Sequence, residues 1–493
     1  MTAEFILAFD QGTTSSRSIL FDAEGRAVAS ASEPLPQHFP KPGWVEHEAE
    51  DIFQTQLATA KRVMKDARIE AAQIAAIGIT NQRETALVWE RATGKPIHRA
   101  IVWQCRRTAP ACEALARSEH MDEIRRRTGL VADAYFSGTK VAWLLDNVPG
   151  ARERAERGEL CFGTVDAWLL MRLAGRHATD PSNASRTMLF NIHTGDWDDD
   201  LLNWLHVPRA MLPELVPTGG VCGATTLLGG EIPIASMVGD QQGALFGQTA
   251  FHPGEGKCTY GTGAFLLVNT GGEPRPSHHG LLSTVAWRRN SATTYALEGS
   301  VFIAGAVVQW LRDEMGLIQT AEESAALAAS VPDTHGVVVV PAFTGLGAPH
   351  WDMRARGIIT GLTRGASRAH IVRAALESVA HQAADVLKAM ESDLGGPIAS
   401  LRVDGGASRN DLLMQMQADL LGRPVIRGEV SETTALGAAY LAGLAVGLWK
   451  SEEELRLHWK VDREFEPQIT ADERAQRRTA WAQAVRMARA GEG

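Results

Sequence analysis

The chain has 493 residues, of which 45% are hydrophobic and 22% charged, so it is long and apolar enough for two or three domains with large cores, and disorder is excluded. Its 49 basic and 58 acidic residues give a net charge of −9 without a basic stripe, which excludes a nucleic-acid-binding surface. No signal peptide is predicted, and the uncharged run 433–449 has too few strongly apolar residues to span a membrane, so we expect a buried helix there.

The five cysteines are widely spaced and form no C-x-x-C pair. This pattern predicts reduced, mostly buried thiols in a cytoplasmic protein.

The first strand and turn form the most informative stretch. Residues 5–9 are apolar, Asp10 follows where this strand ends, and Gly12 permits a tight bend before a second strand. The turn carries hydroxyls and a guanidinium, on Thr13, Thr14, Ser15, Ser16 and Arg17. Such groups suit a phosphate chain, and the Asp10 carboxylate suits the accompanying magnesium ion. A solvated hairpin turn is the alternative, because short motifs of this kind also occur by chance.

Two other nucleotide-binding motifs are absent. Neither Gly94-Lys95 nor Gly256-Lys257 is followed by Ser or Thr as in a P-loop, and no G-x-G-x-x-G occurs. A nucleotide at the first hairpin would therefore be held by neither of those turns.

Strands and helices then alternate along the chain. Apolar periodicity predicts strands over 26–35, 74–80 and 100–103 and a helix over 51–66. This order favours an α/β domain with a substantially parallel sheet, in which ligands gather at the carboxyl ends of strands. Asp10, Arg83 and Trp103 lie at or just past such ends, and are therefore candidate site residues.

Arg83 and Glu84 permit two interpretations. They form either an exposed ion pair of little energetic value, or part of a polyol pocket in which they offer donors and acceptors to hydroxyls. In the second case Trp103 would cover the carbon side of the ligand, and Tyr135 would either extend that wall or be a core aromatic.

Asp240 also has two interpretations. It follows a strand predicted over 232–237 and precedes a helix. It is therefore either the N-cap of that helix or a general base that faces a substrate hydroxyl.

The composition breaks near residue 251, where we place a boundary between domains 1–250 and 251–493. Residues 257–268 then repeat the plan of the first hairpin, with Gly261, Thr262 and Gly263 at the turn. This internal repeat predicts two similar domains, each contributing one phosphate-gripping hairpin to a shared cleft.

The second half is predicted to contain helices over 305–311 and 367–390 and strands over 336–340 and 401–404. Gly405 and Gly406 follow the last strand, where they either let a flat ligand approach the backbone or form an ordinary turn. A capping box at 470–473 predicts a terminal helix with Trp481 and Val485 on one face.

Taken together, these motifs resemble the FGGY carbohydrate-kinase family, within the actin-like ATPase superfamily, almost from end to end. The hairpin and glycine motifs mark the superfamily, and Arg83-Glu84, Trp103 and Asp240-Gln241 mark the branch that acts on glycerol. The segments that carry the resemblance are 10–17, 41–46, 79–85, 101–106, 239–242, 260–263, 343–349 and 403–407.

The resemblance implies two ribonuclease-H-like α/β domains flanking a deep cleft, with glycerol mainly on the N-terminal half and ATP mainly on the C-terminal half. It implies an enzyme that uses ATP and Mg²⁺ to convert glycerol to sn-glycerol 3-phosphate, the first step of glycerol catabolism by this route. It also implies a cytoplasmic homodimer or homotetramer. The short loop 227–232 carries Glu231 and no arginine or histidine, so neither the sugar-bisphosphate inhibition nor the histidine phosphorylation of some bacterial members is expected.

The resemblance also assigns residues to roles. The glycerol hydroxyls would be held by Arg83, Glu84, Tyr135, Asp240 and Gln241, and its carbons by Trp103 and Phe265. The phosphates would meet Thr13, Thr14, Ser15, Arg17 and Thr262, and the rest of the nucleotide Gly305, Gln309, Gly406 and Asn410. Asp10 would hold magnesium, with Asp240 nearby as a second carboxylate, and the catalytic pair would be Asp240 as general base and Arg17 as stabiliser of the transferring phosphoryl group.

Three other functions compete with this one. A sister kinase, for example one that acts on xylulose, would share the fold and the chemistry. A non-transferring ATPase would keep both hairpins but need no Arg83-Glu84-Trp103 pocket. A regulatory protein without catalysis would not need both Asp10 and Asp240.

Overall fold

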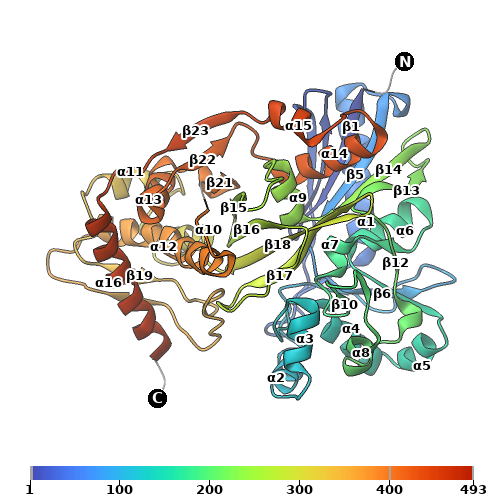
Figure 1. Ribbon diagram of the computed structural model, residues 1–493, viewed down its shortest axis with the longest axis horizontal. Helices are drawn as coiled ribbons and strands as arrows, with labels where there is room; N and C mark the ends of the chain where they lie inside the picture. The colour runs from blue at the N-terminus through green and yellow to red at the C-terminus, as the bar shows by residue number, and fades with distance from the viewer. Residues whose placement is uncertain (1–3, 399–400, 491–493) are drawn as a thin grey trace.

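A computed structural model describes residues 4–398 and 401–490 of the chain. A 13-stranded mixed sheet runs through the whole molecule, in the order β23-β22-β21-β15-β16-β18-β17-β13-β14-β5-β1-β2-β3 (Figure 1). One end of the sheet belongs to the N-terminal half of the chain and the other to the C-terminal half. The two parts of the sheet are joined where β13 pairs with β17.

The N-terminal half of this sheet follows the order β3-β2-β1-β5-β14. β2 runs antiparallel to β1 and β3, whereas β5 runs parallel to both β1 and β14. The strands are β1 (Phe5–Gln11), β2 (Ser15–Phe21), β3 (Ala27–Pro34), β5 (Ile74–Asn81) and β14 (Ile232–Gly239).

The C-terminal half repeats this plan as β18-β16-β15-β21-β22. β16 is antiparallel to β15 and β18, whereas β21 is parallel to β15 and β22. The strands are β15 (Gly256–Tyr260), β16 (Ala264–Gly271), β18 (Ala292–Val301), β21 (Leu401–Asp404) and β22 (Val425–Gly428). The predicted internal repeat is thus confirmed, but the sheet is mixed rather than substantially parallel, because each repeat opens with antiparallel hairpins.

The remaining strands are short or lie at joins and edges. They are β4 (Glu46–His47), β6 (Leu87–Glu90), β7 (Ala100–Ile101), β8 (Leu160–Gly163), β9 (Ala178–Thr179), β10 (Phe190–Asn191), β11 (Asp196–Trp197), β12 (Glu214–Leu215), β13 (Gly219–Thr225), β17 (Leu282–Arg289), β19 (Val338–Val340), β20 (Ile358–Thr360) and β23 (Val461–Phe465).

Helices cover both faces of the sheet and fill the outer ends of the molecule (Figure 1). They are α1 (Ala49–Ala67), α2 (Ala109–Ala116), α3 (Met121–Thr128), α4 (Ser137–Asn147), α5 (Ala151–Glu156), α6 (Val165–Ala174), α7 (Pro181–Ala184), α8 (Asp199–Trp204), α9 (Asp240–Gly247), α10 (Gly305–Asp313), α11 (Glu323–Ala329), α12 (Arg368–Leu394), α13 (Asp411–Leu421), α14 (Thr433–Val446), α15 (Glu452–His458) and α16 (Ala471–Ala490).

Helices α9 and α14 pack against each other at the centre of the molecule, and glycines make this contact possible. A Cβ atom on Gly437 of α14 would lie 1.8 Å from the carbonyl oxygen of Gly243 in α9, and one on Gly247 would lie 2.0 Å from that of Thr433. Only glycine permits this approach. One apolar cluster joins both helices to strands of both halves, through Ala8 of β1 and Leu267 of β16 among others.

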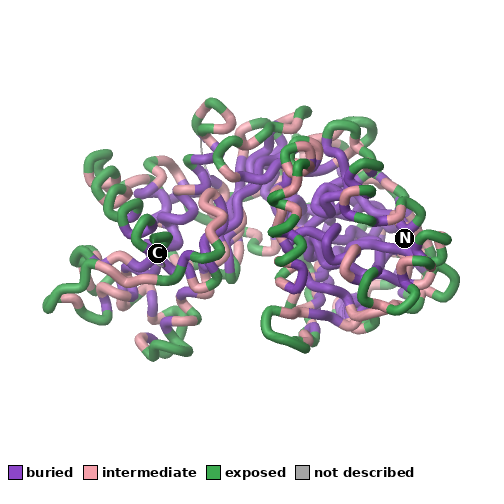
Figure 2. Tube along the Cα trace, turned by 90° about the horizontal axis from the view of Figure 1, so that it is seen from below, coloured by how far each residue is buried: buried purple, intermediate pink, exposed green. Residues whose placement is uncertain are grey.

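Burial follows the sheet and the helices packed on it (Figure 2). Most of the run 433–449 forms the largely buried helix α14, which ends at Val446, and Trp481 and Val485 are among the buried residues of α16, as predicted. All five cysteines are buried and unpaired. Among the described residues, no helix combines the length and apolarity that a membrane span needs.

The strand predicted over 100–103 is wrong in part. Only Ala100 and Ile101 form a strand, and β7 pairs with β4 in a separate two-stranded sheet. Trp103 therefore lies in a turn beyond a small side sheet, not at a strand end of the main sheet. The strand predicted over 336–340 shortens to β19 and pairs only with β20.

Candidate active site

A cleft of about 1050 Å³ lies between the two halves. It is lined by residues of the first hairpin, the second hairpin, α10, the turn after β21 and the start of α14. Seven residues predicted from the sequence line it: Asp10, Arg17, Thr262, Gly305, Gln309, Gly406 and Asn410.

The first hairpin presents its charged side chains to this cleft. Asp10 of β1 stands opposite Arg17 of β2, and the guanidinium of Arg17 forms an ion pair with Glu432, the residue that precedes α14. The turn is closed by a hydrogen bond from Gly12 N to Ser15 O of 3.0 Å. Thr13, Thr14 and Ser15 lie at the accessible tip of the hairpin, outside the set of residues that lines the cleft.

The second hairpin is joined directly to α10. Thr262 accepts hydrogen bonds at its carbonyl from Ala304 and Ala306, at 2.8 and 3.1 Å. Gly305 donates to Gly261 O at 2.9 Å, and a Cβ atom at Gly305 would lie 2.6 Å from that oxygen. Gln309 follows one turn later on the exposed, cleft-lining side of the helix.

The turn after β21 places two glycines in different surroundings. Gly405 has a φ of +85°, and a Cβ atom there would meet Tyr260 O at 2.5 Å, so the fold itself requires glycine. Gly406 lines the cleft, and a Cβ atom there would meet nothing within 4 Å. Asn410 accepts a hydrogen bond from Leu413 N at 3.1 Å and so caps α13.

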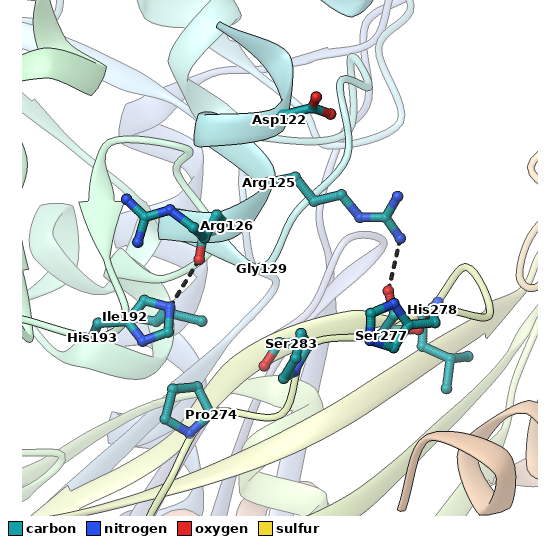
Figure 3. A pocket seen from close by; sticks show the side chains of 12 residues that line it. Asp122, Arg125, Arg126, Gly129, Ile192, His193, Pro274, Ser277, His278 and Ser283 are labelled. Carbon is teal, nitrogen blue, oxygen red and sulfur yellow. Dashed lines mark hydrogen bonds between the residues drawn. The ribbon is translucent and has the colours of Figure 1, made fainter.

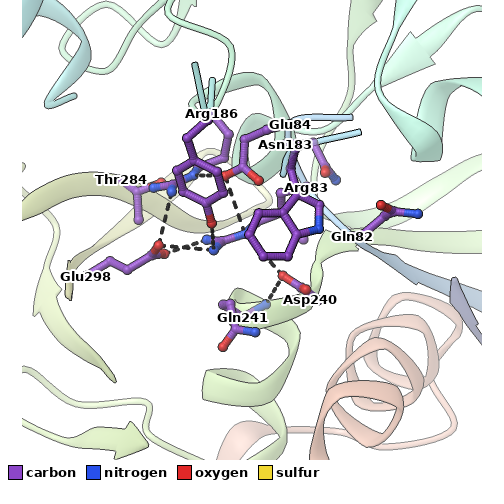
Figure 4. Close-up of polar contacts among 12 residues, drawn as sticks. Gln82, Arg83, Glu84, Asn183, Arg186, Asp240, Gln241, Thr284 and Glu298 are labelled. Carbon is purple, nitrogen blue, oxygen red and sulfur yellow. Dashed lines mark hydrogen bonds and ion pairs between the residues drawn. The ribbon is translucent and has the colours of Figure 1, made fainter. Parts of the chain in front are cut away.

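A second group of predicted residues surrounds Arg83, which is buried (Figure 4). Its Nε lies 3.1 Å from Asp240 Oδ1. Its two terminal nitrogens donate to the two carboxylate oxygens of Glu298 at 2.5 and 3.0 Å. They also donate to Gln242 Oε1 and Tyr135 OH, both at 3.2 Å. The two terminal nitrogens therefore make four hydrogen bonds, one for each of their N–H groups, and Nε forms an ion pair with Asp240.

Glu84 is held in a conformation that is unusual for its residue type. Its φ is +59°, in the left-handed region. The buried ammonium of Lys140 and the hydroxyl of Ser137 donate to its carbonyl at 3.3 and 3.0 Å. Its Oε1 accepts from Arg186 Nε at 2.6 Å, whereas the described residues make no hydrogen bond to Oε2. One carboxylate oxygen thus remains to accept a bond from a ligand.

Aromatic rings border this pocket. The rings of Trp103 and Tyr135 are 5.5 Å apart and meet edge to face. Trp103 Nε1 donates to Thr13 Oγ1 at 2.9 Å, which links the pocket wall to the tip of the first hairpin. Phe265 lies half-buried on β16, where its carbonyl accepts a bond from Lys257 Nζ at 3.3 Å.

Asp240 is the first helical residue of α9, and Gly239 occupies the cap position, so the N-cap interpretation is wrong. Its Oδ1 accepts from Gln241 N at 2.7 Å, and no described residue donates to Oδ2. The side chain is 31% exposed. Desolvation by the surrounding protein raises the pKa of Asp240 above its ordinary value, against the attraction of Arg83.

Asp10 is a partly buried carboxyl group that lies near one guanidinium and two other carboxylates. Burial raises the pKa of Asp10 to about 7, Arg17 opposes this increase, and Glu432 and Asp240 reinforce it. The group therefore gains by binding a cation. No set of three or more His, Cys, Asp or Glu side chains within residues 4–398 and 401–490 is arranged to hold a metal ion by itself.

Four charged residues that the sequence reasoning missed also belong to these surroundings: Arg186, Lys257, Glu298 and Glu432. Lys257 Nζ donates to Gln241 Oε1 at 2.5 Å and to Thr259 Oγ1 at 2.8 Å, and so connects the Arg83 pocket with the cleft. For Glu298, the sequence contained a signal: it is the only charged residue of a strand, β18, and a charge that is buried in a sheet needs a partner.

A second hollow of about 430 Å³ lies apart from these groups, between α3 and residues 274–283 (Figure 3). Arg125 donates across it to Ser277 O at 2.9 Å, and His193 contacts Arg126 O at 2.8 Å. It contains none of the site residues predicted from the sequence.

Comparison with known proteins places this geometry in a family. The chain matches the N-terminal domain of the FGGY family of carbohydrate kinases over residues 5–247 and the C-terminal domain over 256–446. It is 59% identical to a glycerol kinase of Deinococcus radiodurans over 99% of this chain and 98% of that protein. It is 58% identical to a glycerol kinase of Dechloromonas aromatica over 98% and 97% of the two chains.

Two solved structures of carbohydrate kinases have a similar fold. The fold is similar to that of Plasmodium falciparum glycerol kinase with ADP, with a TM-score of 0.93 and 36% identity over 99% of this chain and 98% of the other. A xylulose kinase from Lactobacillus acidophilus shares the fold at a TM-score of 0.90 and 22% identity, over 100% and 99% of the two chains. The chain therefore belongs to the FGGY family of carbohydrate kinases.

Proposed function

We propose that this kinase transfers the γ-phosphoryl group of ATP to glycerol, giving sn-glycerol 3-phosphate and ADP. The observation that carries the proposal is the position of Asp240, whose Oδ1 contacts Arg83 and Gln241 while Oδ2 has no partner among the described residues. The sequence identity of 58–59% to glycerol kinases, over nearly the whole chain, supports the choice of glycerol as substrate.

The polyol fits the pocket around Arg83 by its chemistry. Glu84 Oε2 and Asp240 Oδ2 are acceptors for hydroxyl groups, and the amide group of Gln241 offers a donor beside them. The edge-to-face rings of Trp103 and Tyr135 present apolar surface to the carbon chain.

Asp240 acts as the general base in this mechanism. Its carboxylate accepts the proton of a terminal hydroxyl while that oxygen attacks the γ-phosphorus in line. Arg17 and the backbone N–H groups of the hairpins stabilise the charge on the transferring phosphoryl group. Positioning of the two reactants supplies about 7–11 kcal/mol of the barrier reduction, and closure of the halves excludes water that would otherwise hydrolyse ATP.

A magnesium ion fits beside Asp10. This carboxylate faces the repulsion of Glu432 and Asp240, and a cation would relieve it. Because the described residues form no complete metal cage, the ion would take Asp10, with Asp240 nearby, and complete its shell with water and phosphate oxygens. When bound, the ion neutralises charge on the phosphate oxygens.

An assay of ADP release tests the function. ATP is supplied with glycerol, with xylulose, with erythritol or without an acceptor. ADP release that requires glycerol and falls sharply with the other polyols supports the proposal. Equal rates with xylulose would indicate a sister sugar kinase, and release that no polyol affects would indicate a non-transferring ATPase.

Three broader proposals accompany this function. A boundary near residue 250 separates the two domains, the chain assembles as a homodimer or homotetramer, and it works in the cytoplasm. The unpaired buried cysteines support a reducing compartment. Light scattering coupled to size exclusion measures the assembly state.

A further inference from the structure

Glu298 stands in β18, a strand of the C-terminal half, yet its carboxylate contacts residues of the N-terminal half. The side chain is completely buried. Its Oε2 accepts from Arg83 Nη1 at 2.5 Å, and its Oε1 accepts from Arg83 Nη2 and from Arg186 Nη2, each at 3.0 Å. Glu298 thus joins two arginines that are far from it in sequence.

The orientation of Arg83 depends on this carboxylate. A bidentate pair fixes the plane of a guanidinium, because two parallel N–H groups must meet two oxygens. With both terminal nitrogens directed to Glu298, only the Nε edge of Arg83 remains to face Asp240 (Figure 4). In the part of the chain that the structure describes, Asp240 Oδ1 thus has protein partners and Oδ2 has none.

Arg186 extends the network to Glu84. Its Nε donates to Glu84 Oε1 at 2.6 Å while its Nη2 donates to Glu298. The guanidinium also lies 5.5 and 5.3 Å from the ring centroids of Tyr135 and Phe136. Arg186 is therefore fixed on several sides, and it fixes one oxygen of Glu84.

The cluster of Arg83, Arg186, Glu84, Glu298 and Asp240 carries one net negative charge. Two arginines and two glutamates cancel, so Asp240 carries the only net charge of the five groups. Burial opposes the ionisation of Glu298, but Arg186 and Arg83 outweigh it and hold the pKa of Glu298 at about 2. Loss of the Glu298 charge would leave a buried excess of positive charge beside Asp240.

We propose that Glu298, together with Arg186, is a positioning residue for the polyol: it sets the orientation of Arg83 and Glu84 from the half of the molecule that builds the nucleotide cleft. This inference rests on the proposed function. The positioning role differs from a purely structural role, because a residue that only stabilised the fold would not affect polyol binding selectively.

Glu298→Gln is the direct test. The variant keeps the shape of the side chain but replaces one acceptor by a donor that faces a guanidinium. We expect KM for glycerol to rise about 10–100-fold while KM for ATP changes by less than about twofold. Asp166→Asn is the matched control, since Asp166 is a buried carboxylate that accepts from Thr164 and Thr179 and does not touch Arg83. It should leave KM for glycerol unchanged.

A double-mutant cycle separates action through Arg83 from an independent effect. We compare kcat/KM for glycerol in Glu298→Gln, Arg83→Ala and the double variant. Because Glu298 acts in part through Arg83, Glu298→Gln should lower kcat/KM by a smaller factor in the Arg83→Ala background than in wild type. Effects that multiply, or an unchanged KM for glycerol in Glu298→Gln, would overturn the proposal.

Arg186→Lys keeps the inference testable if Glu298→Gln does not fold. It retains the charge but loses the fork that joins Glu84 and Glu298, so KM for glycerol should rise about tenfold without a change in KM for ATP. A KM for glycerol that stays at the wild-type value would refute the inference. The wild-type enzyme is assayed first: without glycerol-dependent ADP release the proposed function fails, whereas an active wild type with unaffected variants refutes only the positioning role.

Discussion

The Nε atom of Arg83 lies 3.1 Å from Oδ1 of Asp240, and this contact gives the two carboxylate oxygens different roles. One oxygen is committed to the protein, and the other remains without a protein partner among the described residues. The arrangement orients a base without neutralising it by a bidentate ion pair.

Asp240→Asn should therefore remove proton transfer while keeping the shape of the site. General-base contributions are about 10²–10⁴-fold, so kcat should fall by that factor while the affinity for glycerol changes little. The ADP-release assay and calorimetric titration with glycerol measure the two quantities. Near wild-type turnover by a folded variant would show that another group accepts the proton.

Asp10→Asn should stabilise the ligand-free protein, more at high pH than at low pH. The pKa of Asp10 is raised from 3.8 to about 7, so the folded carboxyl resists ionisation. From about pH 4 to pH 7 the unfolded chain loses this proton first, and wild-type stability falls as the pH rises. The melting temperature of the Asn variant should therefore exceed that of wild type by more at about pH 8 than at about pH 5.

The same variant should lose activity, because the carboxylate proposed to hold the metal is gone. A titration of turnover against magnesium concentration should show a higher requirement than in wild type. A pH-independent difference in melting temperature would contradict the environment that we describe for Asp10.

Glu432→Gln should tighten the binding of ADP. Glu432 forms an ion pair with Arg17 at the wall of the cleft, and its charge repels phosphate groups. Removal of this charge frees Arg17 and should lower the Kd for ADP about 3–10-fold at low salt, with a smaller effect at high salt. Glu322→Gln is the control, since Glu322 lines the cleft without a contact to Arg17. Weaker ADP binding would mean that Glu432 serves to hold Arg17 in place.

Gly406→Ala and Gly405→Ala should affect different properties, the first the binding of ATP and the second the stability of the fold. A methyl group on Gly406 would enter the open cleft, so the fold should tolerate it while KM for ATP rises. A methyl group on Gly405 would strike Tyr260 O at a positive φ, so this variant should lose stability by about 1–3 kcal/mol. Thermal unfolding and ATP titration separate the two outcomes. An unchanged KM for ATP in Gly406→Ala would show that the nucleotide does not lie on this turn.

The parts of the site that sequence could predict are those whose chemistry is local. Both hairpins, the Gly405–Gly406 turn and the long helices are specified by residues within one element, and the structure confirms these elements. The roles assigned to the site residues, and the boundary at residue 250, stay predictions.

The parts that sequence could not predict depend on distant partners. Arg83 meets Glu298 across 215 positions of the chain, and no local pattern indicates which carboxylate will reach which guanidinium. Trp103 shows the converse error, since an apolar run resembles a strand although only Ala100 and Ile101 pair with a neighbour. Its place in the pocket is fixed instead by its bond to Thr13.

The interlocked pair α9 and α14 has a practical consequence for dissecting this enzyme. Each helix contributes to a cluster shared with strands of the opposite half, and glycines at 243 and 437 hold their backbones nearly in touch. A fragment that contained only one half would expose this apolar cluster to water. It would therefore be prone to aggregate before ligand binding could be measured. Truncation is thus a poor route to separate the two substrates, and point substitution within the intact polypeptide is the sound one.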